Sequence, residues 1–134
     1  MSVIATEKAR LSNLVKYEEG GLNYYSRDEV TAITGQTINI GSVLGKITAS
    51  GKYILSDADA VDGSQVAAAV CLQNLGTLAA DAQCVVIVRD AIVSRAALVY
   101  DAANDAGEIL IAEDELKALG ILVRAGQADY TFAV

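Results

Sequence analysis

The stretch that decides the fold lies between residues 35 and 55 and reads Gly35-Gln-Thr-Ile-Asn-Ile-Gly-Ser-Val-Leu-Gly-Lys-Ile-Thr-Ala-Ser-Gly-Lys-Tyr-Ile-Leu55. Short runs rich in β-branched residues alternate here with glycines, which is typical of strands joined by tight turns. We expect strands at Ile38–Ile40, Val43–Thr48 and Tyr53–Leu55. Gly51 lies where the turn between the last two strands needs a positive φ angle. The stretch therefore predicts a β-meander.

Two longer apolar runs follow this meander, at Gln65–Leu72 and Gln83–Val88. Both faces of each run are apolar, which is the pattern of strands covered on both sides. In the first run, Val66, Ala68, Val70 and Leu72 share one face. Polar loops are expected at Asp57–Ser64 and Gln73–Asp81, and shorter strand segments at residues 22–33, Ile92–Val93, Leu98–Tyr100 and Ile121–Val123. Tyr130–Val134 is expected to be a terminal strand or a tail.

A single helix is predicted near the C-terminus. Asp105 with Glu108 can cap its start, and Gly120 is placed to stop it in a left-handed conformation. Apolar residues recur at a spacing of three and four, so we expect an inner face made of Ile109, Ala112, Leu116 and Leu119. The predicted fold is mainly β: a compact, single-domain meander or barrel-like structure with one short C-terminal helix.

The segment before residue 21 reads differently from the rest of the chain. It carries apolar residues but no convincing cap or strand partner, and Gly20-Gly21 ends any helix. One interpretation is a frayed terminus, and the other is an extended docking arm that buries its apolar side chains on a partner. We therefore divide the chain into an arm, residues 1–20, and a β-rich domain, residues 21–134. The candidate binding residues of the arm are Val3, Ile4, Leu11, Leu14 and Tyr17.

Composition excludes several classes of function. The chain has 134 residues and a formal charge of −7, which disfavours binding to a nucleic-acid backbone because that binding depends on Lys and Arg. It contains no histidine, the commonest general base and zinc ligand. It shows no membrane-spanning run and no signal peptide, so we expect a soluble protein made in the cytoplasm. Cys71 and Cys84 are expected as buried free thiols, since a cross-strand disulfide is conceivable but disfavoured in a reducing cytoplasm.

Three motifs invite a chemical interpretation, and each has a plainer one. The Asp57, Asp59 and Asp62 carboxylates resemble a calcium loop, but their spacing is wrong for an EF-hand and the closing Glu is missing. Gly41–Lys46 is one residue too short for a phosphate loop, and Ile47 stands where Ser or Thr would hold magnesium. Glu113–Glu115 is interpreted as a solvated helix face, and Arg89, Arg95 and Arg124 as surface side chains or partners in ion pairs. We predict no enzyme activity, no catalytic residue, no metal site and no cofactor.

Several short pieces of the chain occur in a family-specific order between about Tyr24 and Arg124. They are Gly41-Ser-Val-Leu-Gly45-Lys46-Ile47, Ser50-Gly51-Lys52-Tyr53, Asp62-Gly63-Ser64-Gln65, Val86-Ile87-Val88-Arg89 followed by Leu98-Val99, and Leu119-Gly120-Ile121. In this order the chain resembles the lambda-type head decoration proteins of tailed bacteriophages. It departs from them at Tyr100-Asp101, where lambda-like members carry Trp-Pro.

The resemblance implies a β-tulip-like fold and a structural role on the virion. Such proteins bind the outer surface of expanded icosahedral heads, commonly as homotrimers at three-fold and quasi-three-fold positions, and stabilise the shell against the pressure of packaged DNA. The implied partner is the major capsid protein, to which an N-terminal arm often adds a strand, with no nucleic acid or membrane involved. Two alternatives remain open: another phage virion module, such as a tail or baseplate β-domain, and a small ligand-binding protein.

Overall fold

The computed structural model describes residues 14–19 and 25–124, and in this part the chain is mainly β. The strands are β1 Val15–Glu18, β2 Arg27–Ala32, β3 Thr37–Ile38, β4 Val43–Lys46, β5 Tyr53–Leu55, β6 Ala67–Cys71, β7 Gly76–Thr77, β8 Ala82–Ile87, β9 Ala91–Ser94 and β10 Ile121–Arg124. The helices are a short 3-10 turn, η1 Arg95–Ala97, and the helix α2 Ala106–Ala118. The predicted mainly β fold with one short C-terminal helix is confirmed.

Five strands close into a barrel in the order β2-β5-β4-β6-β8. Its pairs are antiparallel except β2 with β5, which meet in parallel through Ala32 and Tyr53. Gly51 turns the chain between β4 and β5 with the predicted positive φ, 73°. The meander expected from residues 35–55 therefore supplies two adjacent barrel strands, and β3 pairs outside the barrel with β7.

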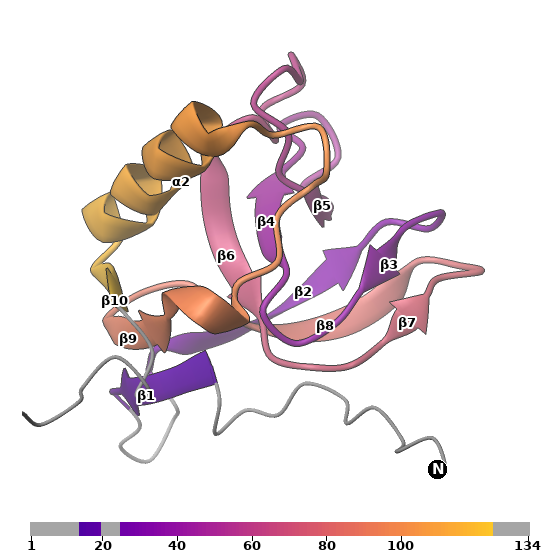
Figure 1. Ribbon diagram of the computed structural model, residues 1–134. Coiled ribbons are helices and arrows are strands. Elements are labelled where there is room, and N and C mark those ends of the chain that lie inside the picture. Colours follow the sequence, from indigo (N-terminus) through magenta and orange to yellow (C-terminus); the bar gives the residue numbers. More distant parts are fainter. Residues whose placement is uncertain (1–13, 20–24, 125–134) are drawn as a thin grey trace, which may run out of the picture.

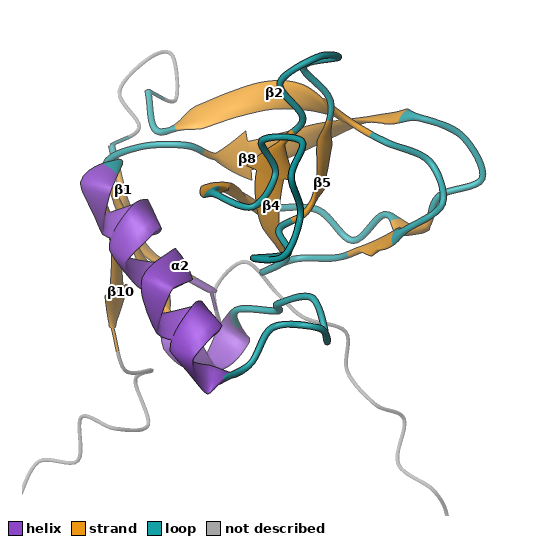
Figure 2. Ribbon diagram, turned by 90° about the horizontal axis from the view of Figure 1, so that it is seen from above, coloured by secondary structure: helices purple, strands orange, loops and turns teal. Residues whose placement is uncertain are grey.

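A second sheet of three strands, in the order β1-β9-β10, lies beside the barrel. β9 is central, antiparallel to β1 and parallel to β10. The helix α2 packs against both β6 and β10, so it bridges the barrel and the small sheet. Figure 1 shows α2 along one side of β6 with the β3 and β7 ribbon on the opposite side. Figure 2, seen from above, groups α2, β1 and β10 to one side of the barrel strands.

Local chemistry explains both ends of α2. The Asp105 carboxylate accepts a hydrogen bond from the Glu108 backbone, and the Glu108 side chain accepts one from the Asp105 backbone, which completes a capping box. At the other end Gly120 has a φ of 85° and donates its N–H to the carbonyl of Lys117. Both predicted ends of the helix are confirmed.

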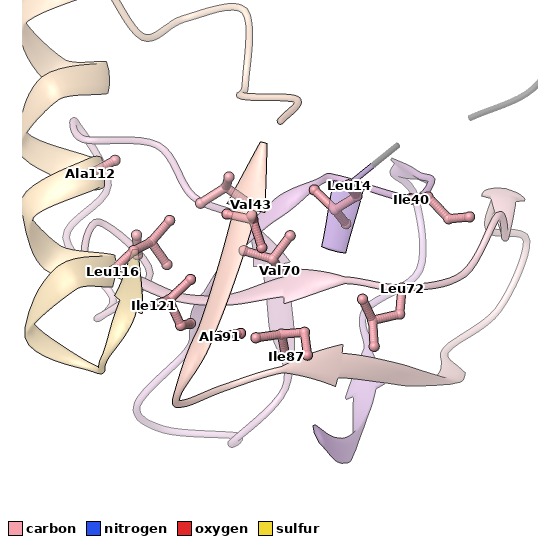
Figure 3. Close-up of a cluster of buried hydrophobic side chains, with 12 residues drawn as sticks. Leu14, Ile40, Val43, Val70, Leu72, Ile87, Ala91, Ala112, Leu116 and Ile121 are labelled. Atoms are coloured by element: carbon pink, nitrogen blue, oxygen red, sulfur yellow. The ribbon is translucent and has the colours of Figure 1, made fainter. Parts of the chain in front are cut away.

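Two apolar cores fill the molecule. All five barrel strands supply side chains to the barrel core, whose buried members are Ala32, Ile38, Leu44, Ala69, Cys71, Leu78, Cys84 and Val86. The outer core lies between the barrel, the small sheet and α2, and comprises Leu14, Ile40, Val43, Ala67, Val70, Leu72, Ile87, Ala91, Val93, Ala112, Leu116 and Ile121. Figure 3 shows Ala112 and Leu116 projecting from α2 into this outer core. Strand β6 contributes side chains to both cores, as expected for a strand whose two faces are apolar.

The structure corrects several details. Leu98–Tyr100 is not a strand; it follows η1 and contributes only the single bridge between Val99 and Ser42. Val66 precedes β6 and is 47% exposed, and Leu119 follows α2 and is 39% exposed, so neither belongs to the buried face assigned to it. The strand or tail expected at Tyr130–Val134 lies outside the described residues.

Candidate functional site

The outer face of the β1-β9-β10 sheet carries a row of apolar side chains. Tyr17 and Leu122 both stand opposite Ile92 in the strand register, so the row crosses all three strands. Side chains alternate between the two faces of a strand, and the neighbours of Ile92 in β9 are part of the outer core. Together with Asp90, Ala91 and Gly120 these three residues line a shallow groove of about 240 Å³, here called the sheet groove.

Tyr17 gives the sheet groove an amphipathic edge. Its side chain is 50% exposed, and its hydroxyl donates a 2.8 Å hydrogen bond to the Glu19 carboxylate. That hydrogen bond, with the negative charge of Glu19, raises the pKa of Tyr17 above its ordinary value. An aromatic ring with a polar tip is a common contact residue at protein interfaces.

Buried polar contacts hold β1 in place beside the barrel. The Ser26 hydroxyl donates to the carbonyl of Asp90 at 2.7 Å and accepts from the Glu19 backbone N–H at 2.8 Å. Ser26 is fully buried, so these bonds satisfy a hydroxyl that would otherwise be costly to bury. Arg27 adds a bidentate ion pair to Glu18, with both distances 2.7 Å. β1 is thus an integrated strand of the domain.

The predicted arm residues are placed as follows. Leu14 is fully buried in the outer core, and Tyr17 points outward from β1. Val3, Ile4 and Leu11 lie outside the described residues. The sequence suggested no strand partner for residues 15–18, and the structure supplies one in β9. Leu14 and β1 are therefore part of the packed structure, although the sequence analysis assigned them to the arm.

The Asp57 and Asp62 carboxylates of the acidic loop accept hydrogen bonds from within their own turns. The Asp62 carboxylate accepts hydrogen bonds from the hydroxyl and the backbone N–H of Ser64, and these bonds hold the pKa of Asp62 below its ordinary value. Asp57 accepts from the backbone N–H of Asp59 at 2.9 Å. Both are Asx turns, which is the plainer interpretation of this motif. Within the residues that the structure describes, no group of three potential ligands is arranged to hold a metal ion.

Gly41 and Gly45, the glycines of the apparent phosphate loop, lie where other parts of the backbone come too close for a side chain. A Cβ atom on Gly41 would lie 2.0 Å from the carbonyl oxygen of Ala97, and one on Gly45 would lie 2.1 Å from that of Ser64. Gly45 is inside β4, and Lys46 is exposed at the end of the strand, as expected. The two glycines allow backbones to approach closely rather than cradling an anion.

The carboxylates of α2 are less solvated than the sequence suggested. Glu113 pairs with Arg95 through two hydrogen bonds of 2.8 and 3.2 Å, and its side chain is largely buried. Glu115 accepts a 3.0 Å hydrogen bond from the backbone N–H of Ala67, which fastens the helix to the start of β6. Both carboxylates have structural partners, so the expectation of a fully solvated face was wrong for them.

Exposed apolar side chains gather on the outward side of α2. Leu110 is 63% exposed and Ile111 is 57% exposed, on a helix whose inward side is formed by Ala112 and Leu116. We call Leu110 and Ile111 the helix patch.

No helix in the described part of the chain is both long and apolar enough to cross a membrane.

Comparison with known proteins gives the family. The model of the family described as bacteriophage lambda head decoration protein D matches residues 4–121. This chain belongs to that family. A search of curated proteins returned no match. The match includes the barrel, α2 and the strands β1 and β9 of the small sheet, ends at the first residue of β10, and extends upstream of β1 into the expected arm.

Membership in the head decoration family gives the protein a structural role at a bacteriophage capsid. This role is consistent with a protein that is not an enzyme.

At the position where the sequence departs from lambda-like members, Tyr100 packs against the outer core. Its buried hydroxyl has no hydrogen-bond partner among the described residues, and burial raises the pKa of Tyr100 to about 12.

Proposed function

We propose that this protein binds the outer surface of an expanded icosahedral phage head and cements it against internal DNA pressure. The observation that carries the proposal is the family match over residues 4–121. A net charge of −7 supports a position outside the shell, since an acidic surface is repelled by the packaged DNA. The proposed partner is the major capsid protein.

We further propose that residues 1–20 include the docking arm, with Val3, Ile4, Leu11 and Tyr17 as contact residues. Leu14, which was expected among them, is buried and instead anchors the arm to the outer core. β1 supports this role because it continues directly from residues 1–13 and is an edge strand of the small sheet as far as the chain is described. Main-chain pairing of an extended segment with a capsid strand would supply affinity with little demand on side-chain identity.

A homotrimer at three-fold and quasi-three-fold positions completes the proposal. The helix patch supports self-association, since Leu110 and Ile111 keep apolar surface in water that a second copy could cover. Weak contacts between copies gain strength when each copy is also held on the capsid. Light scattering of the free protein and imaging of decorated heads test this state, and monomers in both settings would reject the trimer.

The decisive experiment mixes the purified protein with undecorated, expanded heads. Electron microscopy should show added density on the outer surface at symmetry-related positions, and decorated heads should retain DNA at temperatures that burst bare heads. Unexpanded heads serve as the control. Binding to tails or baseplates instead of heads, or decoration with no gain in DNA retention, would contradict the proposal.

A further inference from the structure

The barrel core holds two cysteines in direct contact. Cys71 ends β6 and Cys84 lies in β8, and both side chains are fully buried as free thiols. Their sulfur atoms are 3.1 Å apart, although thirteen residues separate them in the chain. The strands β6 and β8 are neighbours in the barrel, so a bond between the sulfurs would join two adjacent barrel strands.

The surroundings of the two sulfurs differ. The Cys71 sulfur lies 3.4 Å from the Gln73 backbone N–H, which can donate to it, and 3.2 Å from the Gln73 carbonyl oxygen, which can accept from it; either thiol can donate the hydrogen bond between the two sulfurs. The hydrogen bond between the two sulfurs is the main cause that lowers the pKa of Cys71, and the same bond together with burial raises the pKa of Cys84. Cys71 is therefore the thiol of the pair with the lower pKa, and the one that forms a thiolate more readily.

We propose that Cys71 and Cys84 are an oxidation site, at which a peroxide converts the two thiols into an intrachain disulfide between β6 and β8. This property goes beyond the proposed capsid role and does not depend on it. The thiols stay reduced where glutathione maintains them and become cross-linked once the protein is in an oxidising medium.

The reaction has two steps. The Cys71 thiolate attacks one oxygen of hydrogen peroxide and the O–O bond breaks, which leaves a sulfenic acid on Cys71 and releases hydroxide. The Cys84 sulfur then attacks the Cys71 sulfur, the S–S bond forms and the S–O bond breaks. The Cys84 proton leaves with the hydroxyl group as water. Each sulfur is oxidised by one electron, and the peroxide takes up both electrons.

The strand register shows what movement the bond requires. Cys71 stands opposite Val86, so Cys84 is its diagonal neighbour on β8. Diagonal Cα atoms are typically about 7–8 Å apart, whereas a disulfide spans up to about 7 Å without backbone movement. The sulfurs must close from 3.1 Å to about 2.05 Å. The contraction must therefore move the end of β6 at Cys71, where the backbone N–H of Leu72 is hydrogen-bonded to the carbonyl of Val85.

The test treats the purified full-length protein with hydrogen peroxide, quenches the peroxide, and alkylates the remaining thiols under denaturing conditions. Mass spectrometry of a digest should find the peptides of Cys71 and Cys84 joined, with two hydrogen atoms lost and no oxygen added. A non-reducing gel should show only monomers. Thermal unfolding should move up by on the order of 10 °C and return with dithiothreitol, because the closed loop restricts the unfolded chain.

Two variants assign the roles of the sulfurs. In Cys84→Ala the sulfenic acid of Cys71 has no resolving thiol, so dimedone should trap it. In Cys71→Ala, Cys84 should remain a free thiol. The wild-type digest decides the matter even if a variant fails to fold. Complete alkylation of both cysteines after peroxide treatment, a disulfide between two chains, or sulfinic acid on Cys71 beside a free Cys84 would each overturn the proposal.

Discussion

Gly45 is the residue at which the barrel tolerates no side chain. It lies in β4 between β5 and β6, at a point where the register with β6 shifts. An ideal Cβ there would approach the carbonyl oxygen of Ser64 to 2.1 Å and its Cα to 2.7 Å. Both are backbone atoms, so a collision could be relieved only by moving β4 or the segment before β6.

Gly45→Ala should therefore destabilise the protein by about 3 kcal/mol or more, the upper end of the cost of overpacking. Gly35→Ala is the matched control: Gly35 has a φ of 89° but open space around its Cβ position. The free energy of unfolding of this variant should fall by only roughly 1–2 kcal/mol, which is the cost of placing an alanine in the left-handed region. Urea unfolding measures both. A larger loss for Gly35→Ala than for Gly45→Ala would remove the close approach as the explanation.

Residue-scale contacts of this kind were only partly predictable. The positive φ of Gly51 follows from its place in a tight turn and was expected. The demand for glycine at position 45 comes from Ser64, which is distant in sequence and becomes a neighbour only when the barrel closes. Leu14 shows the same limit, since it is buried among outer-core side chains that lie much later in the chain.

At the scale of elements, α2 was predictable because its signals are local. The Asp105 and Glu108 box and the Gly120 stop lie within a few residues of the ends they define. β1 and β7 were missed because each is short and owes its structure to a partner strand far away in sequence. The same reason explains the candidate site: the sheet groove exists only after β1, β9 and β10 have paired.

The packing of α2 is tested by two substitutions on one helix. Leu116→Ala empties a fully buried position in the outer core and should cost about 2–5 kcal/mol. Leu110→Ala makes the same chemical change on the exposed helix patch and should stay within about 0.5 kcal/mol. Thermal or urea unfolding compares the two variants. Equal losses would mean that α2 does not pack on the barrel through Leu116.

At the scale of the whole molecule, the small sheet connects the expected arm to the core. β1 continues from residues 1–13, pairs with β9, and is preceded by Leu14 in the outer core. Tension applied to the arm by a capsid partner would thus reach the barrel and α2 through packed side chains. This arrangement suits the proposed cementing role, because β1 and the outer core are parts of one packed structure.

Two truncations separate docking from folding. Removing residues 1–13 keeps Leu14 and β1, so thermal unfolding should not change, whereas binding to expanded heads should weaken by roughly 100-fold as each copy loses its added strand. Removing residues 1–17 also deletes Leu14 and most of β1, and should in addition lower the stability by about 2–5 kcal/mol. Sedimentation with undecorated heads gives the binding curves, and urea unfolding gives the stabilities. If the variant without residues 1–13 saturated the heads with unchanged affinity, binding would have to come from the β domain itself, through surfaces such as the sheet groove.

The variant without residues 1–17 tests the place of β1. If it unfolded like the intact chain, β1 would not belong to the domain.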